Sequence, residues 1–376
     1  MIRLSGQKFK KGFVVTGVLD PTALANQLAK QRRTVDFDTF DIQMQQLVGM
    51  LEDSQIWIAP AYQRQFRWDP IRCSELVESL MLGIPIPNLF MATNSDNTWE
   101  VVDGLQRLST IAKFAGSDAL RAKLNLGDAL VLQDLKKLDQ FTGFTYETLP
   151  PSLQQHWRTR PIKVVTLNDK SDDVLRFDLF ERLNTGGIAL TKQEIRDCVW
   201  RGGFADLLDE LSETKQFTTV VKLPSNQKKD GTAEECVLRF FAFLDRWKQF
   251  EGDVTGFLNQ YQKDASQSSP AELSKLKGTF LSVFDELSKA FPKGITRTPT
   301  RSITPLNLFE GVAVGAALAL KKEGSINTDG LATWMSSEEL RKFSTVGTNH
   351  KRNVRGRIEF CRDRFLGKPY VPDPEN

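Results

Sequence analysis

The hydrophobic pattern of this chain changes near residue 200, and that change limits the folds that the chain can adopt. Before it, short apolar runs alternate with segments of helical spacing, which predicts strands interleaved with helices. After it, almost every segment has helical spacing, and we expect helices at 232–250, 270–290, 303–322, 336–343 and 350–366. A chain of 376 residues is long enough for about two domains. We therefore predict an α+β fold: a basic arm (1–35), a small mixed α/β domain (36–200) and a mostly helical domain (201–376).

The usage of cysteine and histidine argues against several classes of protein. None of the four cysteines forms a C-x-x-C pair, which indicates buried, reduced thiols and neither a disulfide scaffold nor a zinc ribbon. The two histidines, His156 and His350, are far apart, which argues against a histidine-rich metal site and against an HNH-type nuclease. There is no apolar leader, and the longest apolar run, Val312 to Leu320, is about half of what a bilayer needs. We expect a soluble, cytoplasmic protein without a membrane partner.

Local signals place the elements of the first 200 residues. The expected helices are one that includes Phe40, Met44, Leu47, Val48 and Leu51, one that begins at Asp69-Pro70, and others at 105–115, at 172–183 and after Thr191. The expected strands are 56–58, 89–92, 99–102 and 162–167.

The junction at Asp103-Gly104 is the most informative of these. A hydrophobic strand brings both residues directly to the start of a helix, where unpaired N–H groups attract anions and a glycine lets the backbone approach one. Arg107 can bind a phosphate in bidentate fashion, and Asp103 suits a phosphate-bound Mg²⁺ or a positioned water. On spacing alone, an ordinary Asp-Gly turn with Arg107 on a solvated face fits equally well.

A second segment, Pro60 to Trp68, alternates arginines with aromatic residues in the loop before a capped helix. Arg64 and Arg67 could grip phosphates, and the aromatic rings could stack on a base. The alternative is a turn in which Phe66 and Trp68 fill the core, and for these two side chains we favour burial.

A third segment, Phe180 to Gly187, places Arg182 and Asn184 where a helix ends and a glycine-containing loop begins. Polar groups in such loops often converge on ligands. The alternative is a helix C-cap, for which Asn-Thr-Gly-Gly is also suited.

In this order and spacing, the three segments resemble the N-terminal domain family of GmrSD-type restriction systems, the domain-of-unknown-function family 262. Its members combine a P-x-Y-Q-R-x-[FY]-x-W box, a D-G-Q-Q-R-L box and a later F-x-R-L-N-x-x-G-x-x-L-x-x-x-E segment. The matching ranges here are Pro60 to Trp68, Asp103 to Leu108 and Phe180 to Glu194. The family is similar to the ParB/sulfiredoxin-like fold, in which G-x-x-R at a helix start holds nucleotide phosphates, and Gly104-x-x-Arg107 fits that form.

The resemblance implies a domain that binds a nucleoside triphosphate with Mg²⁺, with hydrolysis as a further expectation, in a restriction or anti-phage system. The implied nucleotide-binding residues are Gln63, Arg64, Arg67, Asp103, Gly104, Gln106, Arg107, Arg182 and Asn184. Of these, Asp103, Gln106 and Arg107 are implied to be catalytic, and Asp103 to be the metal ligand. Leu105 replaces the first glutamine of D-G-Q-Q-R, which bears on hydrolysis more than on binding. Many relatives use an HNH nuclease domain or subunit, so a separate nuclease subunit is an expected partner.

The C-terminal segment suggests a site for DNA. Basic residues far outnumber acidic ones between Arg341 and Lys368, and an apolar stripe with helical spacing would leave the rest of the helix as a basic face. The DNA-binding candidates are Lys351, Arg352, Arg355, Arg357 and Arg362. The alternative is a solvated surface helix, on which His350 would be an ordinary exposed residue.

Three functional hypotheses therefore stay open. The first is a nucleotide-dependent protein that acts on or senses DNA, with NTP hydrolysis as its chemistry. The second is a binding module in which the nucleotide serves only as a switch. The third is a metal-dependent DNA nuclease that uses Asp103 and nearby carboxylates.

Overall fold

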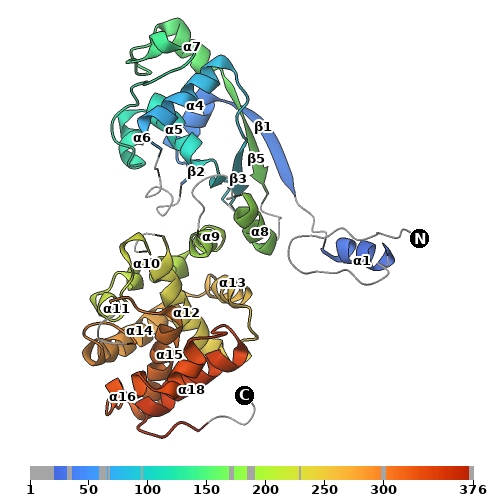
Figure 1. The fold of residues 1–376 in the computed structure, drawn as a ribbon. Helices are drawn as coiled ribbons and strands as arrows, with labels where there is room; N and C mark the ends of the chain where they lie inside the picture. The colour runs from blue at the N-terminus through green and yellow to red at the C-terminus, as the bar shows by residue number, and fades with distance from the viewer. Residues whose placement is uncertain are drawn as a thin grey trace, which may run out of the picture.

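The computed structural model combines a sheet-containing region and a helical region (Figure 1). It describes residues 21–31, 36–58, 66, 68–94, 96–168, 173–183, 191–227, 230–297 and 302–371. The predicted α+β fold is confirmed, because a mixed sheet with helices precedes a region in which the described elements are all helical.

The sheet has five strands, and its two edges are formed by β1 and β2. The strands are β1 (Phe37–Gln43), β2 (Ile56–Trp57), β3 (Leu89–Thr93), β4 (Trp99–Asp103) and β5 (Pro161–Leu167), in the order β1-β5-β3-β4-β2. The β1–β5 and β3–β4 pairs are antiparallel, whereas the β3–β5 and β2–β4 pairs are parallel. The β2–β4 register sets Trp57 opposite Glu100. As a result, β2 and β4 point the same way, and each is followed by one of the first two sequence boxes.

The part of the chain that contains this sheet also contains helices. They are α1 (Pro21–Gln31), α2 (Met44–Glu52), α4 (Pro70–Leu82), α5 (Leu105–Ala115), α6 (Asp118–Lys123), α7 (Pro151–Arg158), α8 (Asp173–Leu183) and α9 (Lys192–Val199), with a 3₁₀ turn, η1, at Asp139–Phe141. Local chemistry sets the ends of α4: the Asp69 side chain accepts the backbone N–H of Arg72 at 2.8 Å, and Gly83 ends the helix with φ +75°. Helix α5 packs on α2 and α4, whereas α8 packs on β4 and α9.

The helical region follows from Gly203. Its elements are α10 (Gly203–Ser212), α11 (Lys215–Val220), η2 (Ser225–Gln227), α12 (Thr232–Arg246), η3 (Trp247–Gln249), α13 (Val254–Ala265), α14 (Pro270–Ala290), α15 (Leu306–Glu323), α16 (Leu331–Met335), α17 (Glu338–Ser344) and α18 (Lys351–Phe365). Helices α15 and α18 lie side by side because two small residues one turn apart, Gly311 and Gly315, face α18. A Cβ at Gly315 would lie 2.6 Å from Cβ of Cys361.

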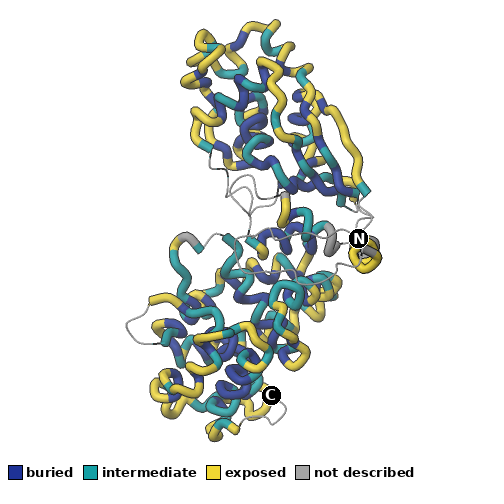
Figure 2. Tube along the Cα trace, turned by 45° about the vertical axis from the view of Figure 1, so that its right-hand side comes forward, coloured by how far each residue is buried: buried dark blue, intermediate teal, exposed yellow. Residues whose placement is uncertain are grey.

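Two hydrophobic cores divide the described residues. One contains buried residues from Ile42 to Trp200, and the other contains buried residues from Phe204 to Phe365 (Figure 2). The four cysteines are buried as free thiols. No helix among the described residues combines the length and the apolar character that a membrane crossing requires.

Some sequence predictions need correction. The helix predicted to include Phe40 begins at Met44, because Phe40 lies in strand β1 and is 41% exposed. Helices α6, α7, α10, α11, α13 and α16 are not among the predicted elements. The part of the predicted basic arm that the structure describes, residues 21–31, is helical, and residues 1–20 lie outside the described range.

Candidate functional site

Strand β4 delivers its last residue, Asp103, to the start of α5 through a glycine in the left-handed conformation. Gly104 has φ +102°, and a Cβ at this position would clash with the side chain of Leu89. Gly104 is also the N-cap of α5, and it has no side chain that could cap this end of the helix. The start of a helix, where backbone N–H groups lack intrahelical partners, is an arrangement that attracts anions in proteins.

Asp103 and Arg107 form an ion pair across the first turn of α5, with 2.7 Å between Oδ2 and Nη2. Arg107 also donates through Nη1 to the carbonyl oxygens of Pro87 and Asn88, the latter at 2.9 Å. Its side chain is 11% exposed. These contacts use three of the five guanidinium N–H groups and fix the segment before β3. No hydrogen bond to another described residue uses the remaining two.

The first and second sequence boxes meet at the start of α5. The side-chain oxygen of Gln106 accepts the backbone N–H of Trp68 at 3.2 Å. Phe66 and Trp68 are half-buried against the core around the sheet, so their predicted packing is confirmed. The amine of Lys113 lies 5.7 Å from the ring centroid of Phe66. Gln63, Arg64 and Arg67 lie outside the described residues.

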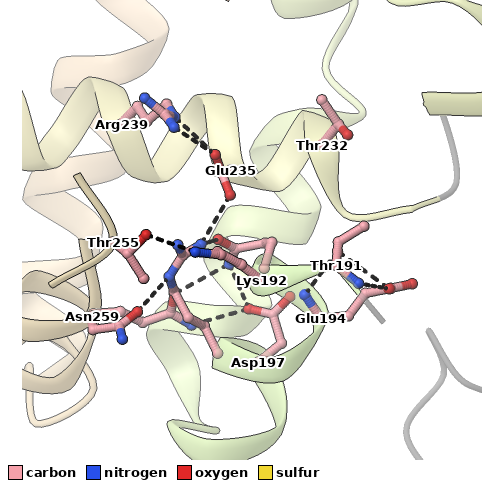
Figure 3. A network of polar contacts seen from close by, with 12 residues as sticks. Thr191, Lys192, Glu194, Asp197, Thr232, Glu235, Arg239, Thr255 and Asn259 are labelled. Carbon is pink, nitrogen blue, oxygen red and sulfur yellow. Dashed lines mark hydrogen bonds and ion pairs between the residues drawn. The ribbon is translucent and has the colours of Figure 1, made fainter. Parts of the chain in front are cut away.

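The third box begins on α8 and ends on α9. Phe180 is buried in the core, whereas Arg182 is exposed at the end of α8, and Asn184 lies outside the described residues. Glu194, the last residue of the box, caps its own helix: its carboxylate accepts the backbone N–H of Thr191 at 2.8 Å, and the Thr191 hydroxyl accepts the N–H of Glu194 (Figure 3). The predicted capping box at Thr191 is therefore confirmed.

Beyond its cap, α9 carries a polar network that joins it to α12 and α13 (Figure 3). Arg196 is 1% exposed and binds Glu235 on α12 at 3.0 Å and Asn259 on α13 at 2.9 Å. Asp197 accepts hydrogen bonds from the amides of Gln193 and Gln262 at 2.8 and 3.0 Å. Burial raises the pKa of Asp197 to about 7 in spite of these hydrogen bonds.

Sequence reasoning missed Glu100, a fully buried carboxylate at the second position of β4. Its relative exposure is 0%, and its Oε2 binds Nη2 and Nε of Arg201 at 3.0 and 3.1 Å. Burial raises the pKa of Glu100 to about 7, although Arg201, the Cys198 thiol and Arg176 all lower it. One signal was present: Glu100 is the only charged residue in the Trp99 to Val102 run, on a central strand.

Asp103 is the candidate metal ligand, and its chemistry is compatible with Mg²⁺. No group of three acidic, histidine or cysteine side chains within the described ranges is arranged to hold a metal ion. Mg²⁺ in nucleotide sites needs only one or two protein carboxylates, because phosphate and water oxygens supply the other ligands. Asp103 keeps one oxygen, Oδ1, outside its ion pair with Arg107.

The basic residues of α18 are only partly arranged as predicted. The apolar stripe at Val354, Ile358, Cys361 and Phe365 is buried. The prediction is wrong for Arg357, which is 1% exposed and binds Glu310 on α15 rather than lying on an outer face.

The other four DNA-binding candidates differ in exposure and in their partners. Lys351 pairs with Glu251 at 2.5 Å, Arg355 donates to the carbonyl of Lys248, and Arg362 pairs with Asp363 at 2.8 Å. Arg352 is exposed, as is the N-cap residue His350. The outer face of α18 is therefore less positive than the sequence suggested, because acidic neighbours offset part of its charge.

Comparison with known proteins gives one match. Residues 46–200 match the family model described as "GmrSD restriction endonuclease, N-terminal domain". This range contains the sheet from β2 onward, all three sequence boxes and α9. No curated protein and no solved structure matches the chain.

Proposed function

Because residues 46–200 belong to the GmrSD restriction endonuclease N-terminal domain family, we propose that this chain is a nucleotide-binding, DNA-acting component of a restriction-type defence system. Its nucleotide site lies at the start of α5. The observation that carries the proposal is the left-handed Gly104 at a helix end without a side-chain cap, next to the Asp103–Arg107 pair. A triphosphate there would meet backbone N–H groups and a guanidinium.

In this proposal, each box supplies one part of the site. Gly104 and the first N–H groups of α5 bind phosphate oxygens, and Arg107 offsets their charge through its two remaining donors. Gln106 fixes the end of the first box by accepting from Trp68. Gln63, Arg64 and Arg67 from the first box, and Arg182 and Asn184 from the third, complete the proposed contacts.

Asp103 would hold Mg²⁺ between itself and the phosphates. The ion would supply charge neutralisation for transfer of the terminal phosphoryl group to water. The ion pair with Arg107 orients the Asp103 carboxylate. Gln106 is proposed to orient the attacking water, since it lies on the first turn of α5, three residues after Asp103.

Titration of ATP, GTP, CTP and UTP with Mg²⁺ into the purified full chain tests this proposal. Binding is followed by calorimetry and turnover by phosphate release. Asp103→Asn should weaken Mg²⁺-dependent binding at least about tenfold and abolish turnover. Arg107→Lys should also weaken binding, because lysine cannot replace a planar guanidinium. Asp206→Asn, an exposed carboxylate on α10, is the matched control. If no nucleotide binds to the wild-type protein, the proposal is wrong.

A nucleotide switch without turnover is the second candidate. The observation in its favour is that Leu105 replaces the first glutamine of the D-G-Q-Q-R box. The same titration separates the two candidates, because a switch binds a nucleotide and releases no phosphate. A metal-dependent nuclease would instead cut DNA without added nucleotide and lose that activity in Asp103→Asn.

DNA is the proposed macromolecular partner, and cleavage is proposed to require a separate nuclease subunit. Lys351 and Arg352 lie at the start of α18, and Arg355 and Arg362 follow on the same helix. If Lys351 and Arg352 contact phosphates, the double variant Lys351→Ala/Arg352→Ala should reduce the slope of log affinity against log salt by about 2. Lys289→Gln on α14 is the control, and an unchanged slope in the double variant would exclude α18 as the DNA contact.

A further inference from the structure

We propose that Glu100 is a positioning residue that fixes the elements carrying the three sequence boxes relative to one another, and that Arg201, just after α9, completes this arrangement. The inference rests on the proposed function, because the boxes form the proposed nucleotide site. Glu100 lies three residues before Asp103 on β4, and its side chain has 0% exposure. It does not reach the site itself and would act through the elements that it joins.

The strands that precede the first two boxes are joined through Arg201, in addition to the Gln106–Trp68 hydrogen bond between the boxes. The guanidinium carbon of Arg201 lies 3.6 Å from the ring centroid of Trp57 on β2, and its nitrogens bind Glu100 on β4. Trp57 and Glu100 are also direct partners in the β2–β4 register. Because β2 is only two residues long, Arg201 adds a second fixed point between the strands that precede the two boxes.

The third box is joined through α8, which packs on β4. Arg176 of α8 faces Glu100 closely enough to lower the pKa of the carboxyl. Its Nε is buried, as is Oε1 of Glu100, and neither atom has a hydrogen-bond partner among the described residues. Burying the carboxylate of Glu100 has a desolvation penalty that an apolar residue at the same strand position would not have. The charge at Glu100 therefore indicates a role other than filling the core.

The contacts of Glu100 with the two arginines depend on pH, because they depend on the charge of its carboxylate. The groups that face Glu100 are Arg201 after α9, Arg176 on α8 and the thiol of Cys198 on α9. Above pH 7 Glu100 is ionised and attracts both arginines. Below pH 7 it takes up a proton, and the attraction is lost. We expect the three boxes to be best ordered, and nucleotide affinity to be highest, at about pH 8.

The first test needs no nucleotide. Hydrogen exchange of the full chain at pH 8 should be about tenfold faster in Glu100→Gln than in the wild type at β2, β4 and the end of α8 together. Asp206→Asn removes the charge of an exposed carboxylate on α10 and should leave these segments unchanged. Arg201→Met, at a side chain that is 30% exposed, should reproduce the effect if Glu100→Gln does not fold. Faster exchange in β4 alone, or no change, would overturn the proposal.

The second test uses the nucleotide that binds most tightly in calorimetry. From pH 8 to pH 6 the wild-type affinity should fall about tenfold more than the affinity of Glu100→Gln, since the titration of the ligand itself is common to both. Equal pH dependence in the two proteins would overturn the proposal. If the wild-type protein binds no nucleotide, the proposed function fails, and hydrogen exchange alone decides whether Glu100 orders the three segments.

Discussion

At the scale of single residues, Gly104 combines an unusual backbone conformation with a crowded position. Gly104→Ala should destabilise the protein by more than the strain of a left-handed alanine, about 1 kcal/mol, because the new Cβ would also clash with Leu89. Gly127→Ala is the matched control, since Gly127 has φ +70° and a Cβ added there would meet no atom within 4 Å. Urea unfolding measures both, and equal losses would show that Leu89 moves aside without penalty.

Asp197 gives a prediction about the pH dependence of stability. Its pKa is about 7 in the folded protein against an ordinary value of 3.8, so the folded state binds more protons between these values. The stability of the wild type should therefore fall as pH rises from about 4 to 7, by at most on the order of 4 kcal/mol from this group. Asp197→Asn should remove that part of the decline.

Urea unfolding of wild type and Asp197→Asn at pH 5 and pH 8 measures the difference. Relative to the wild type, Asp197→Asn should have a higher free energy of unfolding at pH 8, and the difference should be much smaller at pH 5. A variant that loses stability equally at both pH values would show that Asp197 is ionised throughout.

At the scale of elements, the closest helix contact lies between α15 and α18. Gly315→Ala would place a Cβ 2.6 Å from Cβ of Cys361 and 2.7 Å from the backbone nitrogen of Arg362, so α18 would have to shift. We expect a loss of about 1–3 kcal/mol in the free energy of unfolding, as for other overpacked cores. Gly278→Ala on α14 meets no atom within 4 Å and should be neutral or stabilising. Similar effects of the two changes would contradict the close contact.

How far the sequence predicts an element depends on whether its signal is local. Helices α4, α9 and α14 have polar N-caps, with a proline after the cap in α4 and α14, and they begin where the sequence predicts. Strand β1 is an edge strand with one buried residue, Ile42, so it has no alternating pattern, and Phe40 extends the spacing of α2 backward by one turn. Tertiary pairing with β5 decides its structure.

In the candidate site, too, the sequence predicts local features but not contacts between residues that are far apart in the chain. The sequence locates Asp103, Gly104 and Arg107 at a strand–helix junction because the turn and the strand are local features. It gives no indication that Arg107 holds the carbonyls of Pro87 and Asn88 or that Arg201 reaches Glu100, because these partners are 19 or more residues apart. The prediction that Arg357 lies on the exposed face of α18 is wrong for a related reason. The sequence of a helix with basic residues on several sides does not reveal which of them faces a buried glutamate.

At the scale of the whole molecule, a chain of alternating buried charges connects the two hydrophobic cores. It runs from Arg196 on α9 through Glu235 and Arg239 on α12 and Glu310 on α15 to Arg357 on α18. Each contact joins opposite charges, and four of the five side chains are at most 11% exposed. Removing one member leaves its neighbours charged and desolvated, which is costlier than removing an opposite pair.

From this series of ion pairs we predict that the sheet-containing region and the helical region unfold together. We also predict that a substitution at Glu235 uncouples the unfolding of the two regions. In differential scanning calorimetry the wild type should show one transition, whereas Glu235→Gln should lose about 3 kcal/mol and show two, because Arg196 is then buried without an ionic partner. Arg196→Met/Glu235→Gln removes both charges of that contact and should recover part of the loss. A double variant that is less stable than Glu235→Gln would mean that Asn259 and Gln193 alone satisfy Arg196, and that α9 is held to the helical region by hydrogen bonds instead of charge.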